Sequence, residues 1–108
     1  MDISAVVVSF NSLDFLSANL DSLQAQNPPF SRIIVVDNLS TDGSGEFICN
    51  RPGVEACLLK ENIGYAAAAN LGIARCDSQL VLVANADIRL ETGFNRAVLN
   101  HMDRNPDT

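Results

Sequence analysis

Residues 3–10 read ISAVVVSF, an apolar run that is rich in valine and continuous rather than alternating. Such a run is typical of a strand that is buried on both faces of a parallel sheet. Asn11 and Ser12 follow it and can cap a helix, because leucines recur at spacings of three and four across residues 13–23. The opening segment therefore predicts a central strand followed by an amphipathic helix.

The same alternation recurs three more times along the chain. β-Branched and apolar runs predict the strands, and helical spacing or alanine content predicts the helices. The expected strands are residues 32–36, 54–59 and 80–84, and the expected helices end near Cys49, run from Tyr65 to Ala74, and lie between Leu90 and Met102. This alternation, with short connections, predicts an α/β fold: a three-layer, open, mostly parallel sheet with helices on both faces.

Composition and charge limit the kinds of partner. The chain has 108 residues, of which 47% are hydrophobic, so we expect one compact domain. Its 13 acidic residues outnumber 7 Lys and Arg, and the formal net charge is -6. This charge disfavours nucleic acid and anionic membranes as partners. It also repels a nucleoside diphosphate, so a site for one needs a local cation or well-aimed backbone N–H groups.

The cysteines and the single histidine predict no zinc site. Cys49, Cys57 and Cys76 are widely spaced and include no CxxC pair, so we expect buried, inert thiols in a reduced, cytoplasmic chain. His101 has no nearby cysteine to complete a metal site and is expected at the surface. No apolar run reaches the roughly 20 residues that span a bilayer.

Polar and aromatic residues gather where the predicted strands end. The four ends carry Phe10-Asn11, Asp37-Asn38, Lys60 to Asn62, and Asn85-Ala86-Asp87. Each of them alone is an ordinary turn sequence. Because ligands of open α/β sheets bind beyond the carboxyl ends of the strands, their joint placement predicts a binding site.

The residue types at these ends suit a nucleotide and a metal ion. Phe10 can stack on a base, and the Asp37 carboxylate can accept a hydrogen bond from a ring N–H of uracil, thymine or guanine. Asp87 can bind Mg²⁺ or Mn²⁺, whose other ligands are typically phosphates and water. The alternative for Asp87 is that it only caps the turn before Leu90.

Several other nucleotide and catalytic motifs are missing. The sequence contains no GxxxxGK[ST] P-loop, no GxGxxG after the first strand and no GxSxG elbow. ATP hydrolysis, hydride transfer and a nucleophilic serine are therefore disfavoured. A nucleotidyltransferase of similar topology would need a glycine-rich, basic loop at residues 9–13, which this chain lacks.

Five segments together resemble the family 2 glycosyltransferases of the GT-A fold, in the family's order and across nearly the whole chain. They are VVVSFN at 6–11, IVVDNLSTDG at 34–43, ENIGY at 61–65, NLGI at 70–73, and Asn85-Ala86-Asp87. The Asp-Asn-Ser-type loop and the Asn-x-Gly-Tyr segment look most like the bacterial rhamnosyltransferase-like branch.

The resemblance implies transfer of a sugar from a nucleoside diphosphate sugar, UDP- or dTDP-linked, to a saccharide or lipid-linked acceptor. It further implies inversion at the anomeric carbon and assistance by Mg²⁺ or Mn²⁺, which would stabilise the charge on the departing diphosphate. Asp87 stands at the position of the family's DxD motif and would be the metal ligand. The residues implied for nucleotide-sugar binding are Ser9, Phe10, Asn11, Asp37, Asn38, Asn62, Gly64, Asn85 and Asp87.

The sequence also departs from the family's pattern. Asn85 replaces the first aspartate of the DxD motif, which predicts weaker metal binding, and Ala69 stands where many members carry an arginine. Family members continue into an acceptor-binding half that supplies the general base, an Asp or Glu. Residues 1–108 are therefore expected to be the nucleotide-sugar-binding half of a truncated GT-A domain, inactive alone, with the base beyond Thr108.

Two further expectations follow from a truncated domain. Apolar surface left uncovered would favour a homodimer, and the chain is expected in the cytoplasm, either free or peripheral at the inner face of the cell membrane. The alternative to an enzyme is a non-catalytic nucleotide-binding or interaction module that retains the fold. Metal-dependent binding of UDP or dTDP would distinguish the two.

Overall fold

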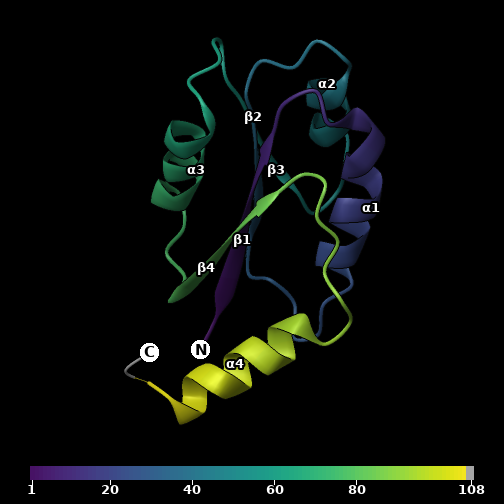
Figure 1. Ribbon diagram of the computed structural model, residues 1–108. Coiled ribbons are helices and arrows are strands. Elements are labelled where there is room, and N and C mark those ends of the chain that lie inside the picture. The colour runs from purple at the N-terminus through teal and green to yellow at the C-terminus, as the bar shows by residue number, and fades with distance from the viewer. Residues whose placement is uncertain (107–108) are drawn as a thin grey trace.

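The computed structural model describes residues 1–106 and contains one sheet whose strands lie in the order β3-β2-β1-β4 (Figure 1). Every strand pairing is parallel, so the predicted α/β fold is confirmed. The elements are β1 (Ile3–Ser9), α1 (Leu13–Gln24), β2 (Ile33–Asp37), α2 (Ser44–Cys49), β3 (Glu55–Leu58), α3 (Tyr65–Ala74), β4 (Leu80–Asn85) and α4 (Phe94–Arg104).

Strand β1 is the centre of the sheet and is buried along its whole length. Its valine-rich sequence suits this position, since both of its faces are covered and both of its edges are paired. Near its carboxyl end, Val8 lies opposite Val36 of β2 and Asn85 of β4. The carboxyl ends of three neighbouring strands are therefore level with one another, as the strand-end prediction required.

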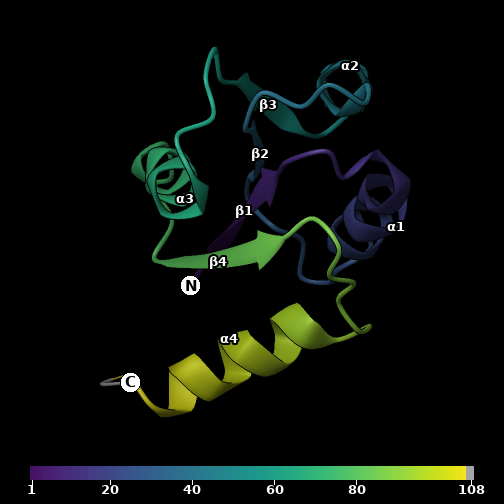
Figure 2. The same cartoon turned by 45° about the horizontal axis from the view of Figure 1, so that its top comes forward.

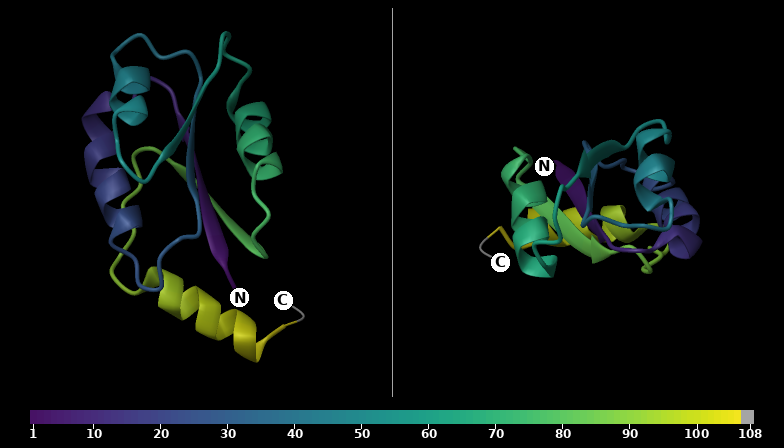
Figure 3. Two further views of the ribbon diagram at one scale, coloured as in Figure 1. Left: turned by 180° about the vertical axis from the view of Figure 1, so that it is seen from behind. Right: turned by 90° about the horizontal axis from the view of Figure 1, so that it is seen from above.

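Helices cover both faces of the sheet. Viewed from above, α3 lies on one side and α1 and α2 lie on the other, with the strands between them (Figure 3). Successive residues of β1 point to opposite faces of the sheet and pack into two separate hydrophobic cores. Val7 packs with the leucines of α1, whereas Val6 packs with the alanines of α3. Helix α4 lies below the sheet in Figure 1 and adds Leu99 to the α1 core.

Helix α3 approaches the sheet closely because its inner face carries small residues. Ala68, Ala69 and Gly72 are buried against β1 and β2. A Cβ added at Gly72 would overlap Val6 Cγ1 and would lie 3.2 Å from Val36 Cγ2. The alanine-rich segment is thus a close-packing surface, as expected from its composition.

Three local expectations were wrong or incomplete. The side chain of Ser12 does not cap α1; instead the Leu13 N–H donates to Asp42 Oδ2 at 3.0 Å, from a loop 29 residues away. Cys49 is exposed rather than buried, because α2 has only six residues and packs through Ile48. Cys57 is buried as expected, but Cys76 is only half-buried.

No helix within residues 1–106 is long and apolar enough to cross a bilayer.

Candidate functional site

A pocket of about 470 Å³ opens at the carboxyl edge of the sheet, and we call it the rim pocket. The ends of β1 and β4 form it together with the first residues of α1 and α3 and the loops that follow β2 and β3. Its lining residues are Val8, Phe10, Asn11, Ser12, Phe15, Asn38, Asn62, Tyr65, Asn85, Ala86 and Asp87.

Most of the predicted site residues meet at the rim pocket. Six of the nine line it: Phe10, Asn11, Asn38, Asn62, Asn85 and Asp87. Ser9, Asp37 and Gly64 do not line it. Ser9 and Asp37 are buried at the carboxyl ends of their strands, and Gly64 shapes the turn that begins α3.

The Asp37 carboxylate binds the chain's own loop. Asp37 is only 3% exposed, and its two oxygens accept hydrogen bonds from the Ser40 N–H at 2.9 Å and the Ser40 hydroxyl at 2.6 Å. The Ser40 hydroxyl oxygen in turn accepts the Asn11 N–H at 2.8 Å. Asp37 therefore fixes the loop that carries Phe10 and Asn11, and direct contact between Asp37 and a base stays a prediction.

Two asparagines shape the turn before α3. The buried Asn38 side chain donates to the Gly64 carbonyl at 3.1 Å and accepts the Ile63 N–H at 3.0 Å. Asn62 Oδ1 accepts the Gly64 N–H at 2.9 Å. Gly64 has a φ of +85°, a backbone conformation that side-chain-bearing residues rarely adopt. These contacts position Tyr65 at the pocket, and they confirm the unusual turn expected at Gly64.

The loops after β1 and β2 are also joined by hydrogen bonds of Asn11 and Asp42, which the sequence did not predict. We call these bonds, and those of Asp37 with Ser40, the loop braces. Asn11, with a φ of +49°, accepts the Thr41 N–H on its side-chain oxygen at 2.8 Å. The Asp42 carboxylate accepts the Leu13 N–H and also bonds Ser44. The hydrogen bond from the Ser44 hydroxyl, with that from Leu13, lowers the pKa of Asp42, so this carboxylate stays ionised to a lower pH than an ordinary aspartate.

Asp87 is the only charged residue among those that line the rim pocket. It is exposed and stands in the turn that follows β4, where the Ile88 N–H donates to the Asn85 carbonyl at 3.2 Å. No group of three or more His, Cys, Asp and Glu side chains suited to a metal ion occurs within the part of the chain that the structure describes. A cation at Asp87 would therefore need further ligands from amides, water or a bound phosphate.

The pocket also contains aromatic residues that the sequence-based site omitted. Phe15 and Tyr65 are 54% and 49% exposed, close to the 51% of the predicted Phe10, and all three line the pocket. Phe15 could have been found, because an aromatic residue that falls outside the buried leucine positions of α1 must face elsewhere. Ala69 is buried against the sheet, so position 69 does not contribute to the pocket.

The fold and the site define a class of protein: an open α/β domain with a ligand pocket at the carboxyl edge of its sheet. Similarity to known protein families identifies the family within this class. The chain belongs to glycosyl transferase family 2, whose model matches residues 4–108.

Relatives and solved structures agree with this assignment. TuaG of Bacillus subtilis, named as a teichuronic acid biosynthesis glycosyltransferase, is 27% identical over 89 residues, which are 79% of this chain and 35% of TuaG. The succinoglycan biosynthesis protein ExoO of Rhizobium meliloti is 26% identical over 104 residues, 94% of this chain and 30% of ExoO. The crystal structure of residues 1–349 of S. aureus TarS in complex with UDP-GlcNAc superposes with a TM-score of 0.84 at 24% identity, covering 96% of this chain and 32% of that fragment. The fold is thus shared. This chain spans about a third of the length of TuaG and ExoO and covers 20% of the crystal structure of S. aureus TarS.

Proposed function

We propose that the rim pocket binds the nucleotide and diphosphate of a UDP- or dTDP-linked sugar, as the donor site of a glycosyltransferase. The observation that carries the proposal is the composition of the pocket: half-exposed aromatic rings and one carboxylate, with no Lys or Arg among the lining residues. The names of TuaG and ExoO, and the UDP-GlcNAc complex of TarS, support a nucleotide-sugar donor used in polysaccharide synthesis.

The aromatic residues suit the base. Phe10, Phe15 and Tyr65 present exposed ring surface to one pocket, and a base stacked on an aromatic ring contributes about 1–3 kcal/mol. The loop braces at Ser40 and Asp42 hold the Phe10 loop before a ligand arrives. Binding is favoured when the contact surface is already ordered, since less conformational entropy is then lost.

The diphosphate needs positive charge that the pocket's side chains do not supply. With a net charge of -6 and Asp87 at the rim, the protein would repel a diphosphate. Mg²⁺ or Mn²⁺ fits this donor set, because such ions bind through one or two carboxylates together with substrate phosphates and water. Asp87 would hold the ion, and the Asn85 amide could orient a water or a ribose hydroxyl. When bound, the ion stabilises negative charge on the leaving diphosphate.

The remaining features of the proposed activity concern the whole protein. We propose transfer with inversion to a saccharide or lipid-linked acceptor, at the cytoplasmic side of the membrane, by an enzyme of the rhamnosyltransferase-like branch. Accepting a proton from the acceptor hydroxyl requires a base within hydrogen-bond reach of it. Asp87 would be occupied by the ion, so we propose that a different part of the enzyme supplies this base.

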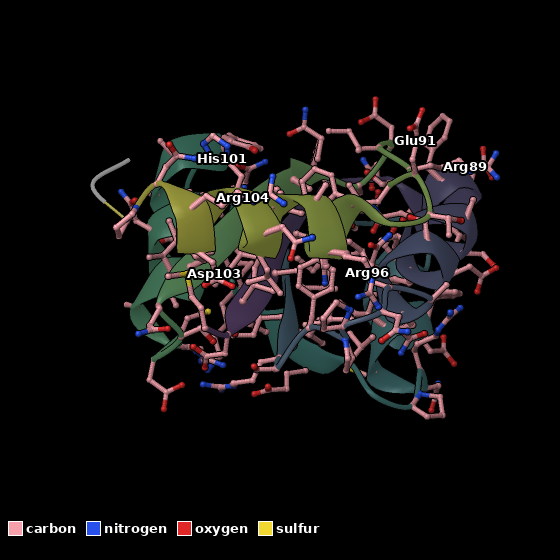
Figure 4. All side chains as sticks on the ribbon, turned by 90° about the horizontal axis from the view of Figure 1, so that it is seen from below. Arg89, Glu91, Arg96, His101, Asp103 and Arg104 are labelled. Atoms are coloured by element: carbon pink, nitrogen blue, oxygen red, sulfur yellow. The ribbon has the colours of Figure 1, made fainter. Side chains whose placement is uncertain are left out.

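A binding titration tests the donor site. UDP and dTDP are titrated by calorimetry into the wild type, Asp87→Asn and Asp103→Asn, each with and without Mn²⁺. Asp103 lies on α4 (Figure 4) and its replacement removes the same charge outside the pocket, so it is the matched control. We expect Mn²⁺ to strengthen binding at least tenfold in the wild type and the control, but not in Asp87→Asn. Absence of nucleotide binding under every condition would instead favour the non-catalytic interaction module.

A further inference from the structure

Helix α1 carries a polar stripe beside its buried leucines. Asn19, Ser22 and Gln26 follow one another at spacings of three and four, so they lie along one side of the helix and its end. Asn19 is only 1% exposed, and Gln26 is also buried. This stripe faces the connection between β4 and α4, which runs alongside α1 (Figure 2).

Asn19 binds both ends of the turn that contains Asp87. Its side-chain NH₂ group donates to the Ile88 carbonyl at 2.7 Å and, more weakly, to the Asn85 carbonyl at 3.4 Å. The same Asn85 carbonyl accepts the Ile88 N–H, which closes the turn. One amide therefore fixes the first and last residues of the turn, with Ala86 and Asp87 between them.

The other two stripe residues hold the segment further along. Ser22 Oγ accepts the Leu90 N–H at 3.0 Å. Gln26 donates to the Glu91 carbonyl at 2.9 Å and accepts the Asn95 N–H, in the first turn of α4, at 2.9 Å. The connection has no helix or strand of its own, so these side chains satisfy backbone groups that regular structure would otherwise pair.

Packing in the core does not explain why position 19 is an asparagine. Its buried neighbours on α1 are Leu16, Leu20 and Leu23, and a leucine at position 19 would bury more apolar surface. Asn19 Oδ1 has no hydrogen-bond partner among residues 1–106, and an unpaired buried polar atom is destabilising. The asparagine is therefore unfavourable for the core, and its contribution is the pair of hydrogen bonds to the Asp87 turn.

We propose that Asn19 is a positioning residue of the donor site, which holds the Asn85–Ile88 turn so that the Asp87 carboxylate faces the rim pocket. Only the consequence for metal and nucleotide rests on the proposed function; the effect on the turn does not. Partners that orient a metal ligand in this way typically change metal affinity by roughly 10- to 100-fold when they are replaced.

Hydrogen exchange tests the effect on the turn without any ligand. Asn19→Leu keeps the number and branching of the side-chain heavy atoms but removes the NH₂ donors. Ile48→Val is the control, since Ile48 lies in the same core but outside the turn. We expect amide exchange in residues 85–92 to accelerate at least tenfold in Asn19→Leu and to match the wild type in Ile48→Val. Unchanged exchange in Asn19→Leu would overturn the proposal whatever the protein binds.

A Mn²⁺ titration in the presence of UDP tests the consequence. We expect Asn19→Leu to need at least tenfold more Mn²⁺ for half-maximal UDP binding, and Ile48→Val to match the wild type. Wild-type Mn²⁺ dependence in Asn19→Leu would overturn the positioning role alone. Failure of the wild type to bind UDP would instead overturn the proposed function, and hydrogen exchange would still decide whether Asn19 fixes the turn.

Discussion

Replacing Gly72 by alanine should destabilise the protein, although alanine is the better helix former. The new Cβ would overlap Val6 Cγ1 and would lie 3.2 Å from Val36 Cγ2, in a core where both valines are fully buried. Overpacking at such a site costs up to about 3 kcal/mol, and the gain in helix propensity offsets about 1 kcal/mol of it. We therefore expect a net loss of about 2 kcal/mol in the free energy of unfolding, or roughly 10 °C in Tm.

Urea denaturation of four proteins tests this reasoning: the wild type, Gly72→Ala, Val6→Ala and the double variant. Because Val6→Ala removes the overlapping methyl group, the double variant should lose at least about 1 kcal/mol less than the sum of the single losses. Ala67→Gly, at an exposed position of α3, measures the propensity effect alone and should cost about 1 kcal/mol. A more stable Gly72→Ala, or strictly additive losses, would refute the close-packing account.

Two further predictions concern the pH dependence of stability and the stacking of the nucleotide base. The pKa of Asp42 lies below its ordinary value because of bonds from Ser44 and Leu13, and that of Glu55 because of the Arg32 side chain. The two ionised carboxylates stabilise the fold fully above their unfolded-state pKa values, and this stabilisation is lost as the pH falls through their folded-state pKa values. The urea concentration at the midpoint of unfolding should therefore fall below about pH 4.5. It should fall less steeply with pH in Asp42→Asn. Phe10→Ala should weaken UDP binding by roughly 5- to 150-fold in calorimetry, since it removes a stacking surface, whereas Ile73→Ala, outside the pocket, should not.

The arrangement of the sheet could be predicted because it follows from a repeated pattern. Alternating strands and helices with short connections lead to parallel strands, and parallel strands deliver their carboxyl ends to one edge. Phe10, Asn85 and Asp87 therefore meet at the rim pocket as expected. Their positions depend on the backbone topology, which the hydrophobic pattern determines.

The contacts of individual polar side chains could not be predicted in the same way. Asp37 stands at the expected strand end, but its bonds to Ser40 depend on the conformation of the following loop. Asp42 caps a helix that begins 29 residues earlier, and Asn19 bonds a turn 66 to 69 residues later. These partners are brought together only by the tertiary fold, and no local spacing reveals them.

Paramagnetic broadening by Mn²⁺ tests most directly whether the residues of the proposed donor site lie together around one bound ion at the rim pocket. With UDP and Mn²⁺ added, the amide NMR signals of residues 10–12, 62–65 and 85–88 should broaden together, whereas residues 100–104 of α4 should stay sharp, because the effect falls steeply with distance from the ion. In Asp87→Asn the broadening should disappear. Broadening centred on α4, or broadening at the rim that persists without the Asp87 carboxylate, would contradict the account.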